Sequence, residues 1–150
     1  MKQQIPAMQS AEGKAGPDSR IVRELVVRKL NELSVNISTR GGEYILEMLM
    51  LILCEQGELM NVAEPVRQIS ERYGIRRESV RASVRYAVTN AWKNGNPEVQ
   101  YRYFGRTVSF QRGKPTESGF ILTLAMHLRH EIQNYNDSPM RNTDIPPEIG

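Results

Sequence analysis

The sequence has little of what most enzymes and metal sites depend on. It holds one cysteine, Cys54, and two histidines among 150 residues. A single cysteine excludes a disulfide within the chain and a cysteine-rich metal site, and it fits a reducing cytosol. The sequence has neither a glycine-rich phosphate loop nor a nucleophile–base arrangement. We therefore expect no enzymatic activity, no cofactor and no bound metal.

Long apolar runs are also missing. Residues 1–19 have no apolar core of a signal peptide. The longest run, residues 44–54, is interrupted by Glu47 and is far short of the roughly 20 residues that a membrane-spanning helix needs. We expect a buried helix there, with Cys54 as an inert buried thiol. No membrane segment is predicted, and the expected location is the cytoplasm.

Positive charge is unevenly distributed along the chain. The whole sequence has 20 basic and 17 acidic residues, a net charge of +3. Residues 62–114 hold 11 basic and 4 acidic residues, a net charge of +7, whereas residues 1–61 sum to −1 and residues 115–150 to −3. This distribution favours an anionic partner for the central block. The alternative is a basic, soluble surface that binds no polyanion.

The length fits one domain. Polar ends rich in glycine or proline predict flexible tails at residues 1–17 and 136–150, and the domain is expected between them, at residues 18–135. Apolar residues at helical spacing predict an all-α fold of five to six helices. The expected helices cover residues 18–34, 43–54, 62–73, 77–94, 96–105 and 117–135.

Several helix ends carry residues that cap helices. The side chains of Asp18 or Ser19, Asn61 and Thr116 can accept hydrogen bonds from the first backbone N–H groups of three helices. Gly74 can end the third helix in a left-handed conformation. The residues expected to face inward are Ile21, Leu25, Val26, Leu30 and Leu33 in the first helix, and Phe120, Ile121, Leu124, Leu128 and Ile132 in the last.

Residues 66–85, VRQISERYGIRRESVRASVR, have the spacing of a helix-turn-helix. Ser70 supplies the small residue that is needed where two helices cross, and Gly74 supplies the left-handed turn four positions later. The side chains expected to clamp the helices together are Ile69, Tyr73, Ile75 and Val80. The pattern favours a DNA-binding motif, although short helix pairs with a glycine turn also occur as plain core structure.

The second helix of the pair, residues 77–94, carries an apolar stripe beside a cationic one. The stripes consist of Val80, Val84 and Val88 and of Arg77, Arg81 and Arg85. At about 100° per residue, the valines face the domain and the edge with Arg81 and Arg85 faces outward. Such a helix can lie in the major groove of DNA. In the alternative interpretation, the arginines are a solvated flank whose aliphatic stems cover apolar surface.

The predicted DNA contacts fall into two sets, because base contacts specify a sequence and phosphate contacts position the protein. The residues expected to contact base edges are Glu78, Ser79, Arg81, Ala82 and Arg85. Those expected to contact phosphates are Arg76, Arg77, Arg106, Arg112 and Lys114.

Two other clusters have simpler explanations. Tyr101, Tyr103 and Phe104 could stack on single-stranded bases, but they are better explained as an anchor before the last helix. His127 and His130 lie three residues apart, but no Asp, Glu or Cys cluster accompanies them in the sequence. We expect no metal site at these histidines.

Two segments resemble a known family. They are SVRASVRYAVTNAWKNGN (79–96) and YFGRTVSFQRGKPTESGFI (103–121), which contain the unusual patterns AW…GN and FG.TVS…KPT.S.FI. They are similar to the C-terminal effector domain of stage-zero sporulation protein A, the response regulator that starts endospore formation in Firmicutes. The resemblance covers roughly residues 22–133. It implies a six-helix domain, a helix-turn-helix, binding to a short DNA box, and contact with the RNA polymerase sigma factor. It also implies a homodimer on tandem boxes.

The resemblance is not complete. Arg85 matches an arginine that contacts DNA in the family, whereas Arg81 replaces a glutamate and Ala82 replaces an arginine. The DNA box is therefore expected to differ. Only about 20 residues precede the first helix. We therefore expect a stand-alone relative, or an excised fragment, without the receiver domain that carries the phosphorylated aspartate.

The sequence thus predicts a sequence-specific, double-stranded DNA-binding transcription regulator. The alternative is a protein-interaction module that binds a sigma factor or a full-length regulator and modulates it without reading DNA itself.

The phosphate set leads to a first prediction. Arg112→Ala should weaken binding to all duplexes alike and flatten the dependence of affinity on salt, because a phosphate contact releases counterions without reading sequence. Gel-shift titrations at several salt concentrations measure both effects. A loss confined to one DNA sequence would contradict the phosphate role.

Overall fold

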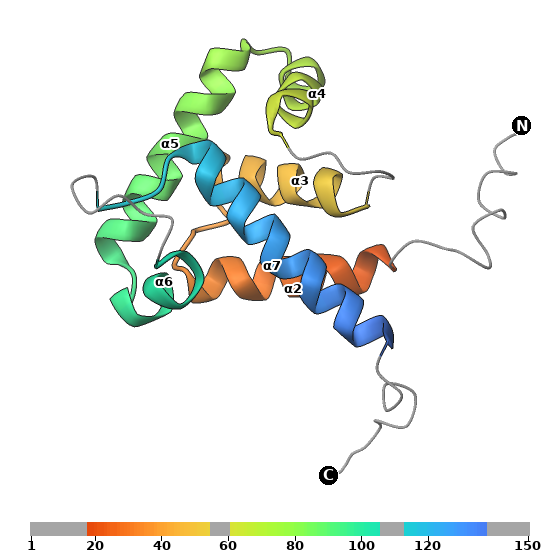
Figure 1. Ribbon diagram of the computed structural model, residues 1–150. Coiled ribbons are helices and arrows are strands. Elements are labelled where there is room, and N and C mark those ends of the chain that lie inside the picture. The colour runs from red at the N-terminus through yellow and green to blue at the C-terminus, as the bar shows by residue number, and fades with distance from the viewer. Residues whose placement is uncertain (1–17, 55–60, 106–112, 138–150) are drawn as a thin grey trace, which may run out of the picture.

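The computed structural model describes residues 18–54, 61–105 and 113–137. These residues form six helices and no strand, which confirms the predicted all-α class (Figure 1). The helices are α2 (Ser19–Glu32), α3 (Arg40–Cys54), α4 (Ala63–Tyr73), α5 (Arg77–Asn94), α6 (Pro97–Phe104) and α7 (Glu117–Asp137). The last helix extends two residues into the segment predicted as a tail. Among the described residues, no helix is both long and apolar enough to cross a bilayer.

Helix α3 lies at the centre of the fold and packs against α2, α4, α5 and α7. In Figure 1, α4 and the start of α5 lie above α3, and α7 begins beside α5 and runs diagonally across α3 and α2. The apolar run of α3 explains this position, since nine of its fifteen residues are buried. The predicted core helix at residues 43–54 is therefore confirmed.

The start of α3 differs from the expectation. The helix begins at Arg40, and both Gly41 and Gly42 lie inside it, buried. A Cβ atom on Gly41 would lie 2.1 Å from the carbonyl oxygen of Ser83 in α5. The two glycines therefore lie inside the helix, at a close approach of backbones, whereas the predicted helix began only at residue 43.

Two side-chain placements were wrong. Ile21 is exposed, because the buried side of α2 is centred on Val22, Val26 and Leu30. Cys54 is the last residue of α3 and is exposed, not buried. In α7 the expected inward face is confirmed, with Phe120, Ile121, Leu124 and Leu128 buried and Ile132 partly buried.

Two of the predicted caps are formed by polar side chains. The Oδ1 atom of Asp18 accepts from the N–H of Arg20 at 2.9 Å at the start of α2, and the hydroxyl of Thr116 accepts from the N–H of Gly119 at 3.0 Å at the start of α7. The N-cap of α4 is Val62, and not the predicted Asn61, whose Oδ1 atom accepts from the N–H of Ala63 at 3.0 Å just before the helix.

An aromatic cluster joins α5, α6 and α7. Trp92 makes edge contacts with Phe104 and Phe120, whose rings stack at a centroid distance of 5.3 Å. Because Phe104 is buried, it cannot stack on a nucleic-acid base. The anchor interpretation of this segment is therefore correct for Phe104.

The α3–α5 crossing leads to a second prediction. Gly41→Ala should lower the free energy of unfolding by about 3 kcal/mol, because the new methyl group meets backbone that cannot move aside without separating the helices. Gly74→Ala is the control, since its Cβ would have no atom within 4 Å and would meet only the strain of φ +66°. That strain costs about 1 kcal/mol. The free energies of unfolding are measured by urea denaturation. If the two variants lose the same amount, the close crossing of α3 and α5 is contradicted.

Candidate nucleic-acid interface

The α4–α5 pair forms a tight helix-turn-helix. Gly74 ends α4 with φ 66° and ψ 37°, the left-handed conformation that its sequence position predicted. Ser70 fastens the turn in two ways. Its carbonyl accepts from the N–H of Ile75 at 3.1 Å, and its hydroxyl donates to the carbonyl of Ile75 at 2.5 Å. The turn therefore holds α5 at a fixed angle to α4.

The predicted clamp is confirmed for three of its four members. Ile69 and Val80 are fully buried and Ile75 is partly buried against the core. Tyr73 is exposed and turns away from α5: its ring lies 5.3 Å from that of Tyr44, and its hydroxyl donates to Glu47. The Glu47 carboxylate raises the pKa of Tyr73 to about 12. Tyr73 therefore fastens α4 to α3, and not to α5.

Helix α5 divides into two sides, as its stripes predicted. Val80, Val84 and Val88 are buried. Of the residues predicted to contact bases, Glu78, Ala82 and Arg85 are exposed, and Ser79 and Arg81 are half-buried. Of those predicted to contact phosphates, Arg76 and Arg77 are exposed and Lys114 is half-buried. Arg106 and Arg112 lie outside the described residues.

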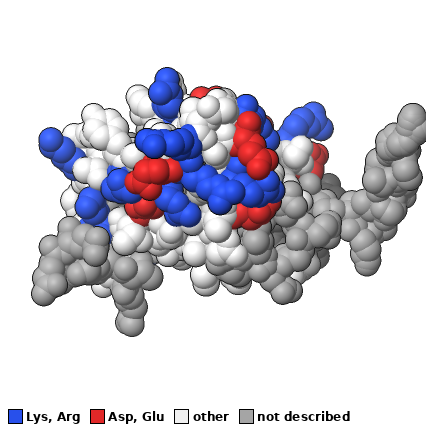
Figure 2. All heavy atoms as spheres, turned by 90° about the horizontal axis from the view of Figure 1, so that it is seen from above, with Lys and Arg blue, Asp and Glu red and all other residues white. Residues whose placement is uncertain are grey.

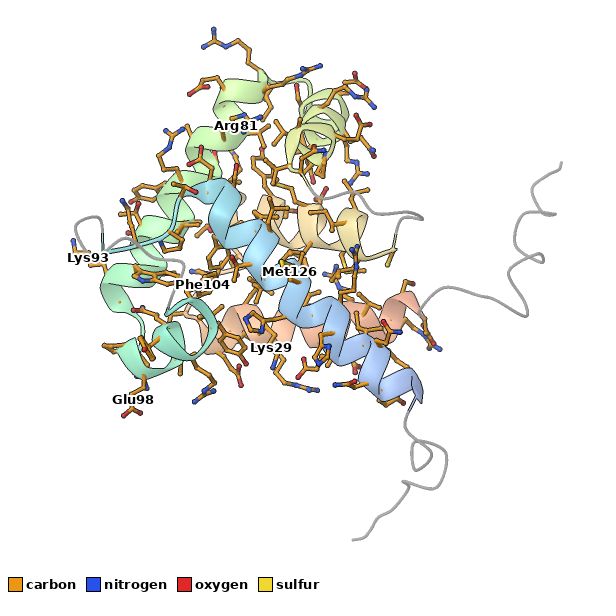
Figure 3. All side chains as sticks on the ribbon, viewed as in Figure 1. Lys29, Arg81, Lys93, Glu98, Phe104 and Met126 are labelled. Atoms are coloured by element: carbon orange, nitrogen blue, oxygen red, sulfur yellow. The ribbon has the colours of Figure 1, made fainter. Side chains whose placement is uncertain are left out.

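Arg81 lies at the margin between these two sides (Figure 3). It lines a small cavity with Val62, Val84 and Glu117. Its aliphatic stem thus covers apolar surface. Among the described residues, no carboxylate oxygen lies within 4 Å of the charged nitrogens of Arg76, Arg77 or Arg81, although the charge of Arg77 helps to lower the pKa of Glu64.

Arg85 is paired with an acidic neighbour in another helix. Its Nε atom lies 3.3 Å from Oε1 of Glu117, and its Nη2 atom lies 3.2 Å from Oε2 of the same residue. Oε2 of Glu78 lies 3.8 Å from Nη2. The hydrogen bonds to Glu117 raise the pKa of Arg85. Half of the Arg85 side chain nevertheless remains open to solvent.

Acidic groups also occur on the first helix of the pair. Arg67 binds Glu64 and, at 2.8 Å, Glu71, so this guanidinium is already neutralised within α4. Figure 2 looks down on the end of the molecule where α4 meets α5, and it shows basic side chains with acidic ones between them. The surface where α4 meets α5 therefore carries both basic and acidic side chains, and its unpaired positive charge lies on α5.

A groove of about 610 Å³ lies on the other flank of α5. The start of α3 contributes Arg40 to it, and α5 contributes Ala82, Tyr86 and Asn90. Of these residues, Ala82 was predicted to contact a base, whereas Arg40, Tyr86 and Asn90 were not among the candidates. A signal for them was present in Gly41 and Gly42, but the predicted helix began only at residue 43.

The two histidines lie on α7. Within the described ranges, no group of three or more His, Cys, Asp or Glu side chains converges. His127 lies against Tyr103, with its Nε2 atom 3.1 Å from the Tyr103 carbonyl oxygen. The phenol of Tyr103 in turn accepts from Lys29 at 2.9 Å and donates to Glu32 at 3.1 Å. These contacts tie α2, α6 and α7 together.

An all-α domain whose helix-turn-helix presents a basic outer helix has the architecture of DNA-binding regulators. The comparison with known families identifies the family to which this domain belongs. The family model described as "Sporulation initiation factor Spo0A C terminal" matches residues 26–128, more than two thirds of the chain. The chain belongs to this family, and it is a DNA-binding domain of transcription regulation in sporulation.

The Arg67 contacts lead to a third prediction. Hydrogen bonds from Arg67 lower the pKa of Glu64 from 4.5 to about 2. Because the folded pKa lies below the unfolded one, the pair stabilises the fold above about pH 4.5, and this contribution is lost as the pH falls through 2. An NMR titration of the side-chain carboxyl should give a midpoint near 2, and Arg67→Ala should return it toward 4.5. A wild-type midpoint near 4.5 would show that the pair does not form.

Proposed function

We propose that this protein is a sequence-specific, double-stranded DNA-binding transcription regulator that places α5 in the major groove. The observation that carries the proposal is the division of α5 into a buried valine side and an exposed polar edge, on a helix held firmly by the Ser70–Ile75 turn. A helix fixed in this way can enter a groove without losing its packing.

The base-reading residues lie on the first half of α5. Arginine pairs with the O6 and N7 atoms of guanine through two hydrogen bonds. Arg85 and Arg81 are the candidates for such pairs, and Glu78 can accept from the N4 amino group of cytosine. Ser79 and Ala82 complete the edge. Because Arg81 and Ala82 depart from the family pattern, the DNA box read here is proposed to differ from the family's box.

Phosphate contacts flank this edge. Arg76 and Arg77 start α5, where the free N–H groups of the helix also favour an anion. Lys114 belongs to the same proposed set, as do Arg106 and Arg112. We add Arg40, since it is exposed and lines the groove beside Ala82.

The partners and the place of action belong to the same proposal. We infer contact with an RNA polymerase sigma factor, and a second copy of the chain on tandem boxes, from the family resemblance. A groove between α6 and α7 supports protein contact, because Tyr101 is 72% exposed and Met126 is 58% exposed within it. The proposed location is the bacterial cytoplasm, in association with the nucleoid.

The alternative, a protein-interaction module, draws support from the pairing of Arg85 with Glu117. A guanidinium held by a carboxylate has less charge to offer to DNA. Selection of binding sites from random duplexes separates the two functions. An enriched motif supports the regulator, and weak, salt-sensitive binding without a motif supports the module.

The selected duplex provides a fourth prediction. Arg85→Ala should weaken binding to it by about 5- to 100-fold, because two hydrogen bonds to a base edge are lost. The circular dichroism spectrum should not change, since Arg85 is exposed. Gel-shift titration measures the affinity, with Arg23→Ala on the exposed surface of α2 as the control. If Arg85→Ala binds the selected duplex as tightly as wild type does, the proposed placement of α5 in the DNA interface is wrong.

A further inference from the structure

We propose that Glu117, the first residue of α7, is a positioning residue that holds Arg85 in the orientation for reading guanine. The inference rests on the proposed function, in which Arg85 contacts a base. It adds a specificity-determining residue from a helix outside the helix-turn-helix.

The contact uses one particular side of the guanidinium. Glu117 accepts from Nε at 3.3 Å and from Nη2 at 3.2 Å, so its two oxygens face the inner side of the group. The Nη1 hydrogens and the second Nη2 hydrogen point away from this contact, since the guanidinium is planar and its donors have fixed directions. An arginine can bind guanine through that outer side while its inner side stays on a carboxylate.

Glu117 is itself held in place. Its side chain is only 21% exposed, whereas that of Glu78, the other acidic neighbour of Arg85, is 71% exposed. Glu117 follows buried Pro115 and the capping residue Thr116, and it lies in the first turn of α7, where a carboxylate is stabilised by the helix dipole. The two residues of the pair thus come from helices that pack on one core.

Holding Arg85 has an entropic benefit and an electrostatic cost. A long side chain that is ordered before binding loses less freedom when it binds. A carboxylate near the interface, however, weakens attraction to every phosphate. A positioning role therefore predicts opposite effects when Glu117 is neutralised: binding to unrelated DNA strengthens, and discrimination at one base pair falls. A merely structural role would not produce this combination.

The experiment compares Glu117→Gln, Glu117→Asp and wild type on the selected duplex and on its single-base-pair variants. The base pair read by Arg85 is the one at which Arg85→Ala loses discrimination. At that base pair, the discrimination between the selected duplex and its variants should be about three- to tenfold smaller for Glu117→Gln than for wild type. Its affinity for unrelated DNA should rise about two- to threefold at moderate salt. Glu117→Asp keeps the charge but is one methylene shorter, so it should lose discrimination without gaining affinity for unrelated DNA.

Glu71→Gln is the charge-matched control, since Glu71 is exposed on α4 and pairs only with Arg67 among the described residues. It should raise affinity for unrelated DNA to a similar extent and leave the discrimination unchanged. Full discrimination in both Glu117 variants would overturn the inference while leaving the proposed function standing. If wild type enriches no motif, the inference falls together with the proposed function.

Discussion

The whole arrangement depends on the close packing of α5 against α3. Val80, Val84 and Val88 are buried in the core, and Gly41 lets the backbones of α3 and α5 approach until there is no room for a Cβ atom. Burial of that stripe determines the rotation of α5 about its axis, and the rotation determines which residues face outward. Ala82 and Arg85 are exposed because they lie off the buried valine side, whereas Arg76 and Arg77 are exposed at the start of the helix.

The outward edge is less positive than a count of arginines suggests. Arg67 is neutralised by Glu64 and Glu71, and Arg85 is bound to Glu117, whereas Arg76, Arg77 and Arg81 carry no ion pair among the described residues. In the proposed function, Arg76 and Arg77 attract DNA of any sequence, whereas Arg81 and Arg85 read bases.

Much of this could be predicted from the sequence, and the failures have physical reasons. The spacing of Ser70, Gly74 and Val80 gave the helix-turn-helix, because turn chemistry and helical period are local properties. The two glycines at the start of α3 were left outside the predicted helix, because the close crossing of Gly41 depends on Ser83, which is far away in the sequence. The Arg85–Glu117 pair was missed for the same reason, since no local pattern brings α7 to α5. The base and phosphate contacts remain predictions.

The most direct test of the central claim is an NMR study of the labelled protein bound to its selected duplex. The account predicts intermolecular NOEs between α5 residues 76–85 and major-groove protons such as thymine methyl and cytosine H5, with the valine methyl groups keeping their contacts to α3. NOEs that come only from the α6–α7 groove, or valine methyl groups that leave the core on binding, would contradict it.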